Sequence, residues 1–488
     1  MSKAKYENYR YTGEVCQVKT QSVVECRFPG AEMATVLAVQ ARVVESKCVC
    51  ADGEVKYDGK LLLGVLYEDG SKRICRAERG AEFYHKASHA EIAPACFAKG
   101  EFSVQSVSHR REGASTYVSV VVDARIDIYK QAETEYLSGG EEIVVKKERL
   151  PIVQISAVSG ETEETDDFSV DGVIDVLLHE EWARATACHA KDGEIEIVGE
   201  LCYDVCALKE DGELVRYERI LPLRTTLPCE ESSEEDGVKA DLEVRRAEVS
   251  IDVSEEDNRA KITFSCGVFA DCSLYKKEGV EMGVDAFSPC QKLRLHHKKV
   301  AGRYLINQKS EEIRVAGTAS CQELEEGWSL SCVCLPTVEL NPKEGGIEGI
   351  LEARALVKKE EEGYRSVTLS LPFALECGAK ENERVDCVVS GLSVRNFGKE
   401  TTQLEGTLKL TVYTYSTVEA DYVAEVEEGE EIPKKTCAFS VYLPKKGDGV
   451  WEVAKKMGVT PEEVTASNPT VEFPVQEGTK IVVYRQKV

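Results

Sequence analysis

The sequence predicts a mainly β protein in which three tandem all-β repeat domains precede a small module of strand, helix, helix and strand. Three observations lead to this prediction. Runs rich in Val, Thr, Ile and Tyr alternate between apolar and polar residues through most of the chain, which is the period of half-buried strands. One set of motifs occurs three times, and helical periodicity is nearly absent before residue 450. A chain of 488 residues is also too long for one ordinary core.

An internal repeat determines the predicted domain organisation. A turn motif that begins at Asp52 returns at Asp192, and a more divergent copy begins at Gly345. Each copy has a glycine a few residues later and then continues through an alternating strand to an acidic glycine turn. The aligned glycines are Gly59, Gly199 and Gly349, and the acidic turns are Glu68-Asp69-Gly70, Glu210-Asp211-Gly212 and Glu361-Glu362-Gly363. Self-similarity of this kind indicates three copies of one structural unit.

The second half of each copy contains a short strand and then a longer one. The longer strands are predicted at residues 117–129, 261–275 and 406–415. In the first of them, six apolar residues share one face, while mostly polar residues share the other; the apolar residues are Val118, Val120, Val122, Ala124, Ile126 and Ile128. A strand with one apolar face covers a core, so each unit should be an all-β sandwich or a partly closed barrel.

Domain boundaries are predicted where acidic and small residues gather. We expect the three β domains at residues 1–145, 165–300 and 301–435, and the terminal module at 438–488. Residues 139–142 should close the first repeat, 159–167 should form a solvated link, and 427–431 should precede the terminal module. The acidic run 230–236 interrupts the second repeat and is predicted to be a loop.

The last fifty residues carry the clearest helix signals in the chain. A strand is expected at residues 438–443, and Val450, Val453, Ala454 and Met457 have the spacing of one apolar helix face that ends at Gly458. A second helix should begin at Thr460, which is a good N-cap. Pro461 suits the first helical position, and Glu463 can complete a capping box. Asn468-Pro469 should end this helix before a final strand at residues 480–484.

This order, with Gly447-Asp448, Trp451, Gly458-Val459 and Asn468-Pro469 where they stand, resembles the LysM module. The resemblance implies a shallow groove between the first strand-to-helix loop and the loop before the last strand. LysM modules usually bind chains that contain N-acetylglucosamine, such as peptidoglycan or chitin. By this resemblance the groove would be lined by Gly447, Asp448, Gly449, Val450, Asn468, Pro469, Thr470 and Val471.

One residue of the predicted groove departs from the family pattern. LysM modules commonly have Thr or Ser after the Gly-Asp pair, whereas this chain has Gly449, which offers no hydroxyl to cap the helix or to face a ligand. This difference favours a protein ligand over a glycan. Binding of peptidoglycan through the groove stays open as the alternative.

The charge distribution sets the module apart from the rest of the chain. The formal net charge is −26, but residues 438–488 carry seven basic and six acidic residues, so residues 1–437 carry −27. So acidic a surface should repel nucleic acids and anionic membranes. We therefore expect neither nucleic-acid binding nor direct membrane insertion, and no apolar run is long enough to span a bilayer.

The nineteen cysteines do not predict a secreted disulfide framework, because the first residues lack the apolar segment of a signal peptide. We expect mostly reduced thiols that pack as small apolar side chains, although later cross-linking stays open. Cys48-Val49-Cys50 and Cys332-Val333-Cys334 each place two thiols on one strand face. Neither has zinc-knuckle spacing, so no metal or cofactor is predicted.

The three repeats, standing before a LysM-like module, resemble the SPOCS domains of spore-coat proteins. Phe28-Pro29-Gly30 with the strand at residues 36–43 resembles the opening of that domain, and residues 55–67 resemble its glycine-bearing strand pair. The resemblance implies a cytoplasmic protein of the mother cell, at the forespore surface and the spore coat. It also implies that the LysM module binds the spore coat morphogenetic ATPase that forms the basement layer of the coat.

No catalytic motif accompanies these features. The chain has no nucleophile elbow, phosphate-binding loop or metalloprotease helix, so it is not expected to be an enzyme. His296-His297 lie among four basic residues, in a stretch that is predicted to be a solvated linker. The sequence therefore predicts a non-enzymatic structural and interaction protein of endospore coat assembly, with a peptidoglycan-binding protein as the alternative.

Overall fold

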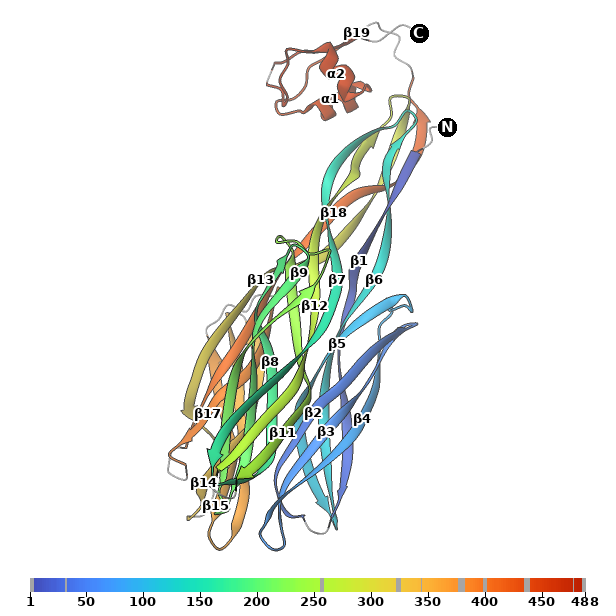
Figure 1. Ribbon diagram of the computed structural model, residues 1–488. Helices are drawn as coiled ribbons and strands as arrows, with labels where there is room; N and C mark the ends of the chain where they lie inside the picture. Colours follow the sequence, from blue (N-terminus) through green and yellow to red (C-terminus); the bar gives the residue numbers. More distant parts are fainter. Residues whose placement is uncertain are drawn as a thin grey trace.

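A computed structural model shows an elongated protein that is mainly β, with two short helices near its C-terminal end (Figure 1). The structure describes residues 4–30, 33–254, 259–321, 326–343, 345–375, 382–397, 402–433, 439–476 and 478–484. The predicted mainly β fold class is confirmed. In this part of the chain, no helix is long and apolar enough to cross a membrane.

The first six strands form two three-stranded antiparallel sheets, which we call the first set. One sheet has the order β1-β6-β5 and the other β2-β3-β4. Strand β5 lies against β2, so the two sheets pack together. The bounds are β1 Ala4–Pro29, β2 Met33–Ala51, β3 Glu54–Asp69, β4 Ile74–Ser88, β5 Cys96–Glu112 and β6 Ser115–Gly140.

The same strand order occurs in the next two sets of six strands. In the second set the sheets are β7-β12-β11 and β8-β9-β10, with bounds β7 Val144–Asp171, β8 Val173–Lys191, β9 Glu194–Lys209, β10 Leu214–Pro228, β11 Gly237–Ser254 and β12 Arg259–Phe287. In the third set the sheets are β13-β18-β17 and β14-β15-β16, with bounds β13 Gln291–Thr318, β14 Ser329–Lys343, β15 Gly346–Lys359, β16 Gly363–Leu375, β17 Glu383–Arg395 and β18 Gln403–Glu431.

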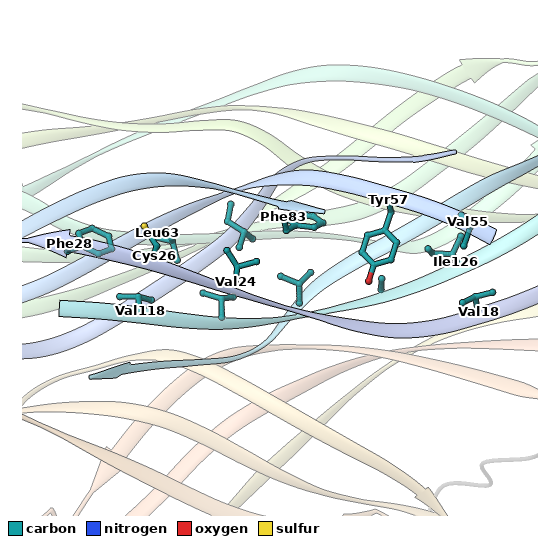
Figure 2. Close-up of a cluster of buried hydrophobic side chains, with 14 of the residues drawn as sticks. Val18, Val24, Cys26, Phe28, Val55, Tyr57, Leu63, Phe83, Val118 and Ile126 are labelled. Atoms are coloured by element: carbon teal, nitrogen blue, oxygen red, sulfur yellow. The ribbon is translucent and has the colours of Figure 1, made fainter. Parts of the chain in front are cut away.

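The core of the first set lies between its two sheets, as Figure 2 shows. The apolar face of β6 that the alternation predicts is buried, from Val118 and Val122 to Ile126 and Ile128. It packs against β3, whose Tyr57, Leu61, Leu63 and Val65 are also buried. Equivalent apolar clusters fill the second and third sets.

The three glycines aligned in the sequence analysis lie at corresponding positions in the three sets of strands. Gly59, Gly199 and Gly349 lie on the central strands β3, β9 and β15, where the neighbouring strand passes very close. A Cβ atom at any of them would lie 2.3–2.4 Å from a carbonyl oxygen of that strand, at Glu45, Arg184 or Glu339. Only glycine fits such an approach, which gives the repeated glycine a physical reason.

Two segments differ from their expected structure. Residues 159–167, expected to be a solvated link, lie inside β7 and pair along β12. His296 and His297, expected in a linker, lie in β13. Their basic neighbourhood is paired across to β18, with His296 close to Glu427 and His297 close to Asp421. In both cases the charged run lies in a paired strand and not in a loop, because a strand with an exposed face tolerates charged side chains that pair with those of its neighbour.

Of the two other acidic runs, one is part of a strand and one is a loop. Residues 427–431 are the end of β18, whereas residues 230–236 do form the predicted loop between β10 and β11. Ala438, the predicted start of the terminal module, lies outside the described residues, as do residues 485–488.

The three sets meet along the long axis of the molecule. Tyr129, Tyr275 and Tyr415 come from β6, β12 and β18 and share one buried cluster. The rings of Tyr275 and Tyr415 meet edge to face, with centroids 6.0 Å apart. The acidic turns also come together, because Glu68 accepts a hydrogen bond from the backbone N–H of Tyr364, whose hydroxyl donates to the Gly212 carbonyl.

The terminal module has the order β19 Phe439–Tyr442, α1 Val450–Met457, α2 Pro461–Ser467 and β20 Ile481–Tyr484. β19 and β20 pair antiparallel. The predicted order of strand, helix, helix and strand is therefore present, and the module lies at one end of the elongated body (Figure 1).

Candidate binding site on the terminal module

The module is built around a small apolar core. Helix α1 contributes Trp451, Val453, Ala454 and Met457, which are buried together with side chains of α2 and β20. Three of these four residues belong to the apolar face predicted from the sequence; Val450, the fourth predicted member, is half-buried at its rim. Gly458 ends the helix with φ 68°, the left-handed conformation that glycine adopts at low cost.

The two helices differ in how their N-termini are capped. Glu452 accepts a hydrogen bond from the Gly449 N–H at 2.9 Å, which is one half of a capping box; Gly449 has no side chain to accept from the N–H groups of the first turn. In α2, Thr460 accepts from the Glu463 N–H, and Glu463 accepts from the Thr460 N–H in return. The predicted capping box of the second helix is confirmed.

The two loops expected to form the groove are tied to each other by backbone hydrogen bonds. Gly447 N–H donates to the Val475 carbonyl, and Val475 N–H donates to the Asp448 carbonyl, both at 3.0 Å. The Asp448 carboxylate accepts from Lys456 and from the Lys445 N–H. The hydrogen bond from Lys456, followed by that from Lys445, lowers the pKa of Asp448. The Asp448 carboxylate therefore stabilises the loop through partners within the module.

Asn468 is a structural residue. Its side chain is 8% exposed. Its Nδ2 donates to the carbonyls of Val464 and Val482 at 2.8 and 2.7 Å, and its Oδ1 accepts from the Val482 N–H at 2.9 Å. All of these partners belong to α2 and β20. The amide thus joins the helix to the strand, and its hydrogen-bonding capacity is turned inward, away from the groove surface where it was expected.

The remaining predicted groove residues differ in their exposure. Gly447, Pro469 and Thr470 are exposed, whereas Asp448 and Gly449 are half-buried. Val450 and Val471 are also half-buried, because both pack against the module core. The exposed members therefore offer a glycine, a proline and one hydroxyl, a set with little chemistry for a polar glycan.

A different surface of the module is strongly apolar. Phe439, Val441 and Leu443 alternate along β19 and just beyond it, and their exposed fractions are 59%, 55% and 64%. Tyr484 of β20, 68% exposed, lies directly opposite Phe439. We call these four residues the outer face. The expected strand at residues 438–443 contained its pattern, but the sequence did not show which side of the strand would face outward.

A contact outside the predicted groove and the outer face joins the module to the end of β12. The Asp285 carboxylate accepts from the Trp451 indole N–H at 2.8 Å and from Lys455 Nζ at 2.6 Å. Phe287 packs edge to face on Trp451, with ring centroids 5.2 Å apart. Although burial opposes it, the hydrogen bonds from Lys455 and Trp451 lower the pKa of Asp285. Trp451 therefore belongs to an interface as well as to the module core, which no signal in the sequence indicated.

The body of the protein contains a cleft of about 930 Å³ where the three sets meet. Several charged side chains of its wall belong to one ion-pair network, which includes the buried Lys239 behind the wall. Lys239 lies 2.7 Å from both Glu101 and Asp241, and Arg384 pairs with Glu101 and, at 3.1 Å, with Asp386. Burial alone would raise the pKa of Glu101, but Lys239 and Arg384 lower it to about 2. This pairing identifies the charges as a structural junction.

Among the described residues, no group of three or more His, Cys, Asp or Glu side chains is placed to hold a metal ion. Cys332 and Cys334 are buried, and Cys48 and Cys50 are half-buried on β2.

Comparison of the chain with known protein families, with curated proteins and with solved structures gave no match.

Proposed function

We propose that this chain is a non-enzymatic structural and interaction protein of endospore coat assembly. Its terminal LysM-like module would bind the spore coat morphogenetic ATPase, in the mother-cell cytoplasm at the forespore surface. The observation that carries the proposal is the outer face. Its four side chains are among the large apolar side chains that are exposed in the described chain, and all four lie on or next to the short strands β19 and β20. Exposed apolar clusters mark protein interaction sites.

The body supports the same proposal through its architecture. We propose that the three sets of strands are three copies of one SPOCS-like repeat, which together form a rigid support for the module. The shared strand order and the common surroundings of Gly59, Gly199 and Gly349 favour this interpretation. On this basis the second domain would extend from β7, and the third from β13.

The alternative, binding of peptidoglycan through the loops, has weaker support. Pro469 and Thr470 are exposed beside Gly447, and the module lacks the acidic bias of the body. However, Asn468 is committed to the fold, and Glu452 occupies the space beside Gly449: a Cβ atom there would lie 2.7 Å from its carboxylate.

The proposal is tested by binding of the full-length chain to the purified coat ATPase. Val441→Asp places a charge on the outer face without disturbing buried packing, and we expect it to weaken binding by about tenfold or more. Val23→Asp is the matched control, because Val23 is 69% exposed on β1, outside the module. It should bind normally.

Co-sedimentation with purified peptidoglycan tests the alternative on the same proteins. No saturable binding is expected. Equal affinity of both variants for the ATPase would reject the outer face, and saturable glycan binding by the full-length chain would make the wall-binding function the better explanation.

A further inference from the structure

The acidic turns lie beside a buried layer to which all three sets contribute. The residue seven positions after each repeated glycine belongs to it: Leu66, Cys206 and Leu356, on β3, β9 and β15. Their partners on the neighbouring strands are Ala38, Leu178 and Cys332. All six are at most 5% exposed. Four of these positions hold the apolar side chains that such a layer requires.

Two cysteines of this layer touch each other across the boundary between two sets. Sγ of Cys206, from the second set, lies 3.8 Å from Sγ of Cys332, from the third. A disulfide needs a sulfur separation of about 2 Å, so a shift of roughly 1.8 Å would join them. Cys206 and Cys332 thus face each other where the second set packs against the third.

A third thiol, Cys334, lies next to the pair. Hydrogen bonds from Cys206 and Cys334 lower the pKa of Cys332, although its burial opposes this effect. The same hydrogen bonding, followed by burial, raises the pKa of Cys206 and of Cys334. Of the three thiols, Cys332 is therefore the one that ionises most readily, and the thiolate is the form that attacks an oxidant.

We propose that Cys206 and Cys332 are a modification site, at which hydrogen peroxide forms a disulfide that joins β9 of the second set to β14 of the third. This inference is independent of the proposed binding function of the module. The bond would close a loop of 126 residues between the two sets. Cross-links that close long loops restrict the unfolded chain most.

The reaction balances in two steps. The Cys332 thiolate attacks one peroxide oxygen, the O–O bond breaks, and Cys332 becomes a sulfenic acid while the second oxygen leaves as hydroxide and takes up a proton to give water. The Cys206 thiol then attacks the Cys332 sulfur and releases its proton, and the sulfenic oxygen leaves as a second water. Two electrons pass from the sulfurs to the peroxide.

Peptide mapping of the full-length protein tests the site directly. The reduced protein is treated with hydrogen peroxide under native conditions. It is then denatured in the presence of an alkylating agent, which blocks the remaining free thiols, and digested without reductant. We expect a linked peptide that contains Cys206 and Cys332 and has lost two hydrogens. We also expect a higher denaturation midpoint, which dithiothreitol reverses.

Two substitutions make the test specific. Cys206→Ala should abolish both the linked peptide and the rise in midpoint. Cys202→Ala removes an equally buried thiol of the same strand, which has no hydrogen bond to another thiol among the described residues, and should leave both in place. If Cys206 and Cys332 of the treated wild-type protein are both fully alkylated, or if Cys206 is linked to a different cysteine, the proposal is wrong. The wild-type map gives this answer even if a variant fails to fold.

Discussion

At the scale of single residues, the terminal module shows how the same side chain can be read in two ways. Asn468 matches a motif position next to a binding groove, yet its amide makes three hydrogen bonds to α2 and β20. A buried amide must find partners within the protein, because an unpaired one is costly. The hydrogen bonds that join β20 to α2 therefore account for an asparagine at position 468 without a ligand.

Asn468→Ala should destabilise the protein module by about 2 kcal/mol, because it leaves the Val482 N–H without its partner in a buried site. Hydrogen exchange of the module's amides, which reports the free energy of opening, measures this loss. Thr470→Ala, two residues away and exposed, is the control and should change little. Unchanged protection in the Asn468 variant would mean that its hydrogen bonds do not hold β20.

At the scale of elements, the position of the module depends on the end of β12. Asp285 and Phe287 together contact the Trp451 side chain, and Asp285 also binds Lys455. This contact buries one side of α1 and leaves the outer face of β19 and β20 exposed. The orientation of the module thus determines which of its surfaces a partner can reach.

Asp285→Ala should loosen this contact, and we expect amides of α1 to exchange about tenfold faster, corresponding to the loss of one charge-assisted hydrogen bond. The module itself should stay folded, so the α2 amides serve as the internal control. Equal exchange in α1 of both proteins would show that the apolar contact of Phe287 suffices.

The same contact should depend on pH. The pKa of Asp285 is lower in the folded protein than its ordinary value, so its contribution is complete above that ordinary value. It is lost as the pH falls toward the lowered pKa. Exchange rates of α1 in the wild-type protein should therefore approach those of the Asp285→Ala variant on acidification.

At the scale of the whole molecule, charge pairs and tyrosines hold the three sets together along one axis. Glu101 of the first set binds Lys239 of the second and Arg384 of the third, so one carboxylate connects all three. Lys239 is 3% exposed. A buried cation of this kind is stable only while its acidic partners are present.

Glu101→Gln should lower the free energy of unfolding by about 3 kcal/mol, because Lys239 and Arg384 each lose a charged partner in the interior. Denaturant unfolding of the full chain measures this effect. Glu25→Gln is a suitable control, because the ion pair of Glu25 with Arg110 is solvent-exposed and should contribute little. A similar loss in both variants would argue against a central role for Glu101.

Acid should weaken the same junction. Its neighbours hold the pKa of Glu101 at about 2, below the ordinary value of 4.5, so its stabilising contribution is complete above pH 4.5 and disappears as the pH falls toward 2. The Glu101→Gln variant should lack this part of the acid dependence.

The sequence by itself determined the features that depend on local chemistry. Alternation fixed the buried face of β6, and the capping residues and Gly458 fixed both helices, because these signals act between neighbours in the chain. The existence of three repeats stays a prediction that the common strand order favours.

Only the tertiary structure decided which charged segments are strands and which distant side chains meet. Residues 159–167 became part of β7 because β12 pairs along them, and Asn468 turned inward because β20 needed its amide. Glu101, Asp285 and the Cys206–Cys332 contact depend on partners more than a hundred residues away. No local pattern records such partners, because packing between the sets brings them together.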